Sequence, residues 1–108
     1  MDYNYKSALD YFNKAVEKNA NSEVFLYRGI TSLKLGNYEG AISDLNKSEQ
    51  EFDEKTTSYT KFDIYYNRGL AYLYNSEIYN AKRDLESAKS LATGNKLEEV
   101  HNYLTKLE

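Results

Sequence analysis

Residues 27–33 read Tyr-Arg-Gly-Ile-Thr-Ser-Leu, and residues 67–73 read Asn-Arg-Gly-Leu-Ala-Tyr-Leu. Twelve residues after the glycine of each segment comes an alanine, Ala41 or Ala81, and three positions beyond each alanine comes Asp-Leu. The second half of the pattern also occurs at residues 5–16, with its alanine 33 residues before that of the central copy. The chain is therefore built on an internal repeat, and a repeat decides the architecture before any single helix or strand is assigned.

Composition narrows the class of protein. The chain has 108 residues and a formal charge of −3, which suits one domain and argues against the basic stripe of a nucleic-acid-binding protein. No run approaches the roughly twenty apolar residues of a membrane span, and the first residues do not resemble a signal peptide, so we expect a cytoplasmic protein with no membrane partner. Cysteine and proline are both absent from the sequence, and the lack of proline favours long helices.

The repeat resembles the tetratricopeptide repeat, a helix–turn–helix unit of about 34 residues. The central copy matches the family pattern at Phe25, Gly29, Gly36, Tyr38, Ala41 and Leu45. The next copy matches it at Tyr65, Gly69, Tyr72, Ala81, Leu85 and Ala88. The chain departs from the pattern at Ser76, which replaces the glycine between helices, and in having no proline at the repeat ends. The resemblance implies an all-α fold, a right-handed α-solenoid of antiparallel helix pairs with about six helices.

The repeat register divides this single domain into four parts. We expect a half repeat at 1–21, full repeats at 22–55 and 59–94, and a C-terminal capping helix at 95–108. The helices are predicted at about 3–18, 23–35, 38–52, 59 or 62–74, 77–92 and 96–107, with a break at 56–58. Ser22 is the expected N-cap of the second helix, and Gly94 is expected to close the fifth.

Two recurring features predict how the helices pack. Gly29 and Gly69 lie within helices, where glycine is unfavourable, so we expect close helix contacts there, with the repeat alanines on the facing helices. Arg28 precedes Asp44 by sixteen residues, and Arg68 precedes Asp84 by the same number, so we expect each arginine to bond the aspartate of the adjoining helix. The alternative is that these are unrelated surface charges.

The two ends of the repeat array differ. The last helix carries one apolar stripe with polar residues opposite, as expected of a helix that covers the open end of a stack. The stripe consists of Leu97, Val100, Leu104 and Leu107. The first helix lacks the helix that would precede it in a complete repeat, so we expect an uncovered apolar flank beside it.

The resemblance also implies a ligand groove lined by the first helix of each repeat. Carried over in register, the groove residues are Leu26, Ile30, Leu33, Lys34, Asp63, Tyr66, Leu70, Leu73, Tyr74 and His101. Apolar residues occupy the positions at which chaperone-binding relatives hold a carboxylate, so the expected ligand is a peptide or the apolar face of an amphipathic helix. The alternative is that Leu26, Ile30, Leu70 and Leu73 are simply core, covered by the curvature of the superhelix.

Residues for catalysis are not apparent. The single histidine, His101, has no Cys/His cluster around it, and we find no metal-binding or phosphate-binding motif. We therefore expect no enzyme activity, no metal and no cofactor. The predicted function is protein–protein interaction, as a scaffold or adaptor. The alternatives are a unit that assembles with its own copies, as a homodimer for example, and a piece of a larger repeat protein.

Overall fold

The computed structural model describes residues 4–55 and 61–108. These residues form six α-helices and no strand, which confirms the all-α prediction for the described part of the chain. The helices are α1 (Tyr5–Lys18), α2 (Ser22–Lys34), α3 (Tyr38–Gln50), α4 (Lys61–Tyr74), α5 (Ile78–Leu91) and α6 (Gly94–Lys106). The predicted break at 56–58 and the earlier of the two predicted starts of the fourth helix, residue 59, lie outside the described residues.

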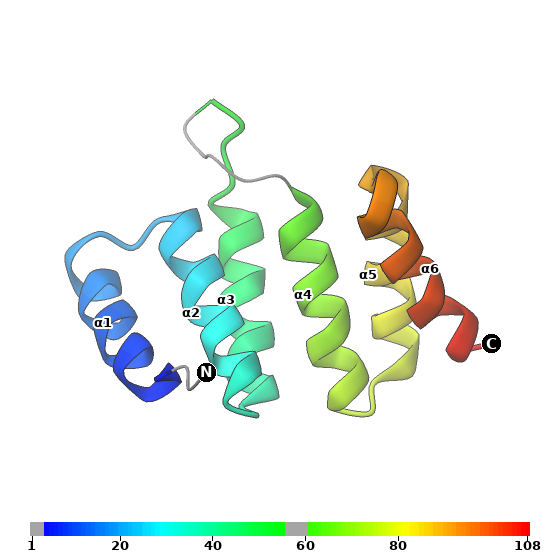
Figure 1. Ribbon diagram of the computed structural model, residues 1–108. Helices are drawn as coiled ribbons and strands as arrows, with labels where there is room; N and C mark the ends of the chain where they lie inside the picture. Colours follow the sequence, from blue (N-terminus) through cyan, green and yellow to red (C-terminus); the bar gives the residue numbers. More distant parts are fainter. Residues whose placement is uncertain (1–3, 56–60) are drawn as a thin grey trace.

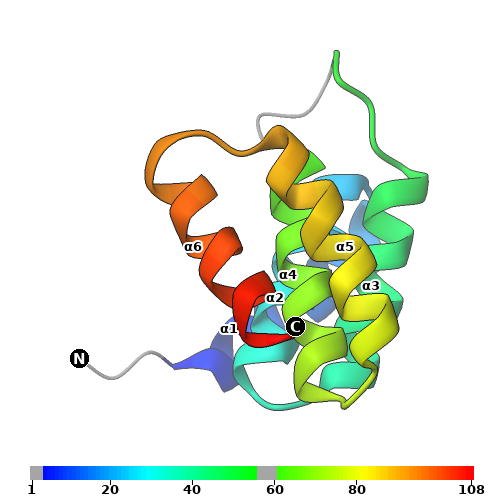
Figure 2. The ribbon, with the colours of Figure 1, turned by 90° about the vertical axis from the view of Figure 1, so that its right-hand side faces the viewer.

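The helices stand in a row from α1 at one end to α6 at the other (Figure 1). The closest packing is within two pairs, α2 with α3 and α4 with α5, and the contact of α3 with α4 joins the pairs. Seen along the row, α3 and α5 lie on one side of α2 and α4 (Figure 2). The terminal helix α1 packs against α2, and the terminal helix α6 packs against α5. Each helix therefore contacts the next one in the row.

Asparagine side chains begin the first three helices. The Oδ1 atoms of Asn4, Asn21 and Asn37 accept hydrogen bonds from the backbone N–H three residues later, at 3.0, 2.9 and 3.0 Å. The predicted N-cap Ser22 is therefore wrong, because Asn21 caps α2. The Ser22 hydroxyl is buried and donates to the carbonyl oxygen of Ser48 in α3 at 2.6 Å, so it joins two helices.

The turns within the two helix pairs share an unusual backbone conformation. Gly36, between α2 and α3, has φ +83°, and Ser76, between α4 and α5, has φ +63°. Glycine adopts this left-handed region without steric cost, whereas a serine there is strained.

The prediction that Gly94 closes the fifth helix is wrong. The α5 helix ends at Leu91, and Gly94 begins α6 with φ +58°.

The predicted arginine–aspartate bonds are confirmed in both repeats. Arg28 Nε and Nη2 donate to the two carboxylate oxygens of Asp44 at 2.7 and 2.8 Å. Arg68 makes the same two bonds to Asp84 at 2.7 and 2.9 Å. Paired bonds of this kind fix the orientation of both side chains, so each arginine locks the two helices of its repeat together.

The third nitrogen of each arginine reaches the preceding repeat. Arg28 Nη1 donates to Asn13 in α1 at 3.3 Å, and Arg68 Nη1 donates to Asn46 and Glu49 in α3 at 2.9 and 2.7 Å. Burial lowers the pKa of Arg68, but the bonds to Asp84 and Glu49 more than reverse this, so the net pKa is raised. The guanidinium therefore stays charged and joins three helices.

The two helical glycines allow the expected close approach, with a different neighbour. A Cβ atom at Gly29 would lie 2.9 Å from Cγ of Leu45, and one at Gly69 would lie 2.9 Å from Cγ of Leu85. These leucines follow the repeat alanines by four residues, and the backbone oxygen of Ala41 lies 3.3 Å from the same point at Gly29. The tight contact is thus glycine on leucine.

Candidate functional site

Three of the residues predicted to line a groove are buried in the core. Leu26 packs with Leu45 and Ile64, while Leu33 and Leu70 pack together in a neighbouring cluster. Their side chains hold α2, α3 and α4 together and present almost no surface. For Leu26 and Leu70 this burial favours the core alternative over the groove, and Leu33 is buried in the same way.

Tyr66, another predicted groove residue, has its partners in α6. Its hydroxyl donates to Oε1 of Glu99 at 2.8 Å, and its ring lies edge-on to Tyr103 with the centroids 6.2 Å apart. Burial, followed by the bond to Glu99, raises the pKa of the Tyr66 phenol. Helix α6 therefore covers part of Tyr66, which is half-buried.

The remaining predicted groove residues differ in exposure. Ile30, Asp63 and Leu73 are half-buried, and Lys34 and Tyr74 are exposed in the last turns of α2 and α4. His101 lies apart, in a shallow cleft of about 360 Å³ at the α6 end of the row. Its neighbours there are Lys89, Gly94, Leu97 and Glu98. Of the exposed members of the predicted groove, Lys34 and Tyr74 are neighbours, whereas His101 lies in a separate cleft.

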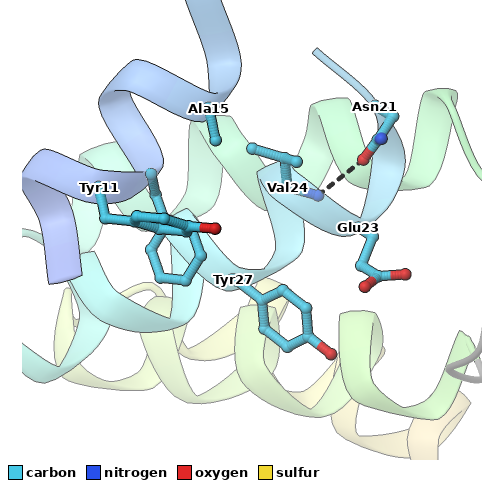
Figure 3. A pocket seen from close by; sticks show the side chains of 7 residues that line it. Tyr11, Ala15, Asn21, Glu23, Val24 and Tyr27 are labelled. Atoms are coloured by element: carbon cyan, nitrogen blue, oxygen red, sulfur yellow. Dashed lines mark hydrogen bonds between the residues drawn. The ribbon is translucent and has the colours of Figure 1, made fainter. Parts of the chain in front are cut away.

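The larger cleft lies at the opposite end, between α1 and α2, and has a volume of about 460 Å³. It is lined by Tyr11, Phe12 and Ala15 of α1 and by Asn21, Glu23, Val24 and Tyr27 at the start of α2 (Figure 3). Glu23 is the one charged residue among these seven. The uncovered flank predicted beside the first helix is this cleft, although none of its residues was identified in advance.

Aromatic side chains dominate the surface of the cleft. Tyr11 is 68% exposed and Tyr27 is 40% exposed. The ring of Phe12 stacks on Tyr27 with the centroids 6.0 Å apart, and it meets Tyr11 edge-on at 5.3 Å. Rings held in this way form an ordered apolar surface, and surfaces of this kind usually mark interaction sites.

The α1 helix explains why this surface is open. None of the residues of α1 is buried, whereas α3 and α5 each bury their alanine and leucine of the repeat pattern. In those two helices the apolar face is covered by α2 and α4, respectively. Phe12 holds the position of Leu45 and Leu85 in the repeat, and no described helix covers it in the same way.

Within residues 4–55 and 61–108, no three His, Asp or Glu side chains are grouped to hold a metal ion. No helix in the same part of the chain is long and apolar enough to cross a membrane. No protein-family model matches the sequence, and neither the curated proteins nor the solved structures yield a match.

Proposed function

We propose that this protein is a non-catalytic protein–protein interaction module of the tetratricopeptide type, a right-handed solenoid that serves as a cytoplasmic adaptor. Its ligand is an amphipathic helix or peptide. The repeated arginine–aspartate bonds and glycine–leucine contacts support the family, because they give each helix pair the same packing.

The observation that carries the proposal is the cleft between α1 and α2. It is lined mainly by apolar and aromatic side chains, and Tyr11 is 68% exposed in it. Aromatic residues are enriched where proteins bind one another, since they bury much area and lose few rotamers. An apolar cleft between two helices suits the apolar face of a third.

Selection from a displayed library of helical peptides tests this function. We expect the protein to select amphipathic peptides, and Tyr11→Ser to weaken their binding by about tenfold, as truncation at an interaction hot spot does. Tyr79→Ser is the matched control, because Tyr79 is a helix tyrosine that is 79% exposed and lies on α5, outside the cleft. Failure to select any peptide would contradict the function.

The same peptides test the groove that the sequence predicts. Tyr74 is 51% exposed, and its ring packs on Tyr38 with the centroids 5.7 Å apart. If binding depends on Tyr74 and not on Tyr11, the function stands and the ligand lies on α4. If it depends on Tyr11, the ligand lies in the cleft.

A further inference from the structure

The α1–α2 cleft is one position of the repeat at which the described residues supply two of three members. In the centre of the molecule Leu26 of α2, Leu45 of α3 and Ile64 of α4 form one buried cluster. One repeat earlier, Phe12 takes the place of Leu45 and Val24 takes the place of Ile64. Both of these residues line the cleft, and no described helix supplies the counterpart of Leu26.

The other end of the chain shows what covers such a position. Val100 and Tyr103 in α6 have the same spacing as Val24 and Tyr27 in α2. Val100 is fully buried in the cluster that α4 and α5 form, and Tyr103 packs on Tyr66 of α4. In α6 the valine and tyrosine are thus covered by a preceding helix, whereas in α2 the equivalent pair faces the cleft.

We infer that the cleft is the docking site for an amphipathic α-helix of another protein, which packs on α1 as α2 packs on α3 and as α4 packs on α5. The inference rests on the proposed function and adds the location and chemistry of the ligand. The proposed interface is equivalent to two interfaces that exist within the chain, those of α2 with α3 and of α4 with α5. The side chains of α2 and α4 at these interfaces therefore indicate which side chains the docked helix presents.

Phe12 and Ala15 determine the sizes of two of these side chains. Gly29 and Gly69 lie against Leu45 and Leu85, so the docked helix has a small residue opposite Phe12. Ala15 corresponds to Ala88, which packs with Phe62 of α4, and Phe62 precedes Gly69 by seven residues. The docked helix therefore carries a bulky apolar residue seven positions before its small one.

Tyr11 determines whether a third side chain of the docked helix is apolar or charged, and it thereby selects among ligand helices. It stands where the repeat has Asp44 and Asp84, the acceptors of Arg28 and Arg68. A docked helix with arginine just before its small residue would find a phenol ring in place of a carboxylate. An apolar side chain there packs on the ring without leaving a buried charge unpaired.

A second copy of the chain is a poorer occupant than a foreign helix. The apolar residues of α6, Val100 and Leu104, are buried within their own chain. The exposed side of α6 presents Leu97, which is 38% exposed, together with Glu98 and His101 beside Lys89. The α6 end of one copy therefore offers the cleft of the next a leucine among charged side chains, and not the continuous apolar stripe of an amphipathic helix.

Two peptides and two proteins test the inference. Both peptides carry the 14-residue sequence of α4, one with its native arginine and one with the substitution R68L. The proteins are the unaltered chain and Tyr11→Asp, a change at an exposed position of α1. Titration calorimetry measures the four affinities, and circular dichroism checks that the helical content of both proteins is the same.

We expect the unaltered chain to bind the R68L peptide about tenfold more tightly than the native peptide. The arginine of the native peptide would lose its water in the cleft without gaining a carboxylate partner, whereas the leucine has no charge to desolvate. Tyr11→Asp restores the carboxylate of the repeat and reverses this order. A misfolded variant would lose both peptides, so a reversal can come only from the local pairing.

Three results would overturn the inference. They are binding of neither peptide, a preference that Tyr11→Asp leaves unchanged, and a dimer in sedimentation that Tyr11→Asp dissociates. The last result would assign the cleft to a second copy. If library-selected peptides still bind Tyr11→Asp at full strength, the interaction function survives and only this location fails.

Discussion

Arg68 in α4 and Asp84 in α5 form a two-bond ion pair whose side chains are 7% and 2% exposed, whereas Arg28 in the equivalent pair is 20% exposed. Breaking a buried pair by removing one partner leaves an uncompensated charge. We expect Asp84→Ala to lower the free energy of unfolding by about 3 kcal/mol. Asp44→Ala, at the more exposed pair, should cost about 1–2 kcal/mol.

Urea unfolding followed by circular dichroism measures both values. Arg68→Lys is an informative companion, because lysine keeps the charge but cannot make the paired bonds of the guanidinium. Equal losses for the two aspartates would show that burial does not separate the two pairs.

The contact of Gly29 with Leu45 predicts the effect of an added methyl group. Alanine favours helices over glycine by about 1 kcal/mol, but its Cβ at position 29 would lie 2.9 Å from Leu45 Cγ. We expect Gly29→Ala to destabilise the protein by about 1–2 kcal/mol, since overpacking outweighs the propensity gain. In the background of Leu45→Ala the same change should cost less, because only the contact with the backbone oxygen of Ala41, at 3.3 Å, remains. Additive effects in this double-mutant cycle would contradict the contact.

Ser76 predicts a stabilising substitution. Its φ of +63° is close to that of Gly36 at the equivalent turn, and a side chain in this region costs roughly 1–2 kcal/mol. We expect Ser76→Gly to raise the stability by about 1 kcal/mol after the entropy of the unfolded glycine is deducted. Gly36→Ser is the reciprocal variant and should lower it by a similar amount. Thermal unfolding of the two variants provides the measurement, and shifts of the same sign would refute the argument.

The Tyr66 phenol predicts the response to alkali. Burial and the bond to Glu99 raise its pKa above the ordinary value of about 10. The neutral phenol therefore stabilises the fold fully below pH of about 10, and this contribution is lost as the pH rises through the folded pKa. Spectrophotometric titration of the tyrosines should show a late-ionising fraction that Tyr66→Phe reduces. A titration curve unchanged by that variant would disprove the raised pKa.

Much of the fold could be predicted because the repeat records contacts as spacings. The sixteen-residue separation of Arg28 and Asp44 places them on facing helices, and the structure confirms that bond. The N-cap of α2 was mispredicted because Asn21 and Ser22 both suit a cap. Only the packed structure shows that the Ser22 hydroxyl bonds to α3 instead.

The candidate site was less accessible to sequence analysis. Leu26 and Leu70 have the periodicity of a groove as well as of a core, and only the position of the neighbouring helices decides between them. The cleft between α1 and α2 depends on how Tyr27 lies over Phe12, a contact between two helices that no local pattern encodes. The signal that was available is Tyr11, the one aromatic residue where two other copies have aspartate.

The lack of any buried residue in α1 has a consequence for local unfolding. A helix opens independently of the rest when little apolar area would be exposed, so amide hydrogens in α1 should exchange faster than those in α5, which buries Ala81, Leu85 and Ala88. A partner in the cleft would bind the closed form alone and slow that exchange by mass action. The stability of α1 against local unfolding would then rise with the concentration of its partner.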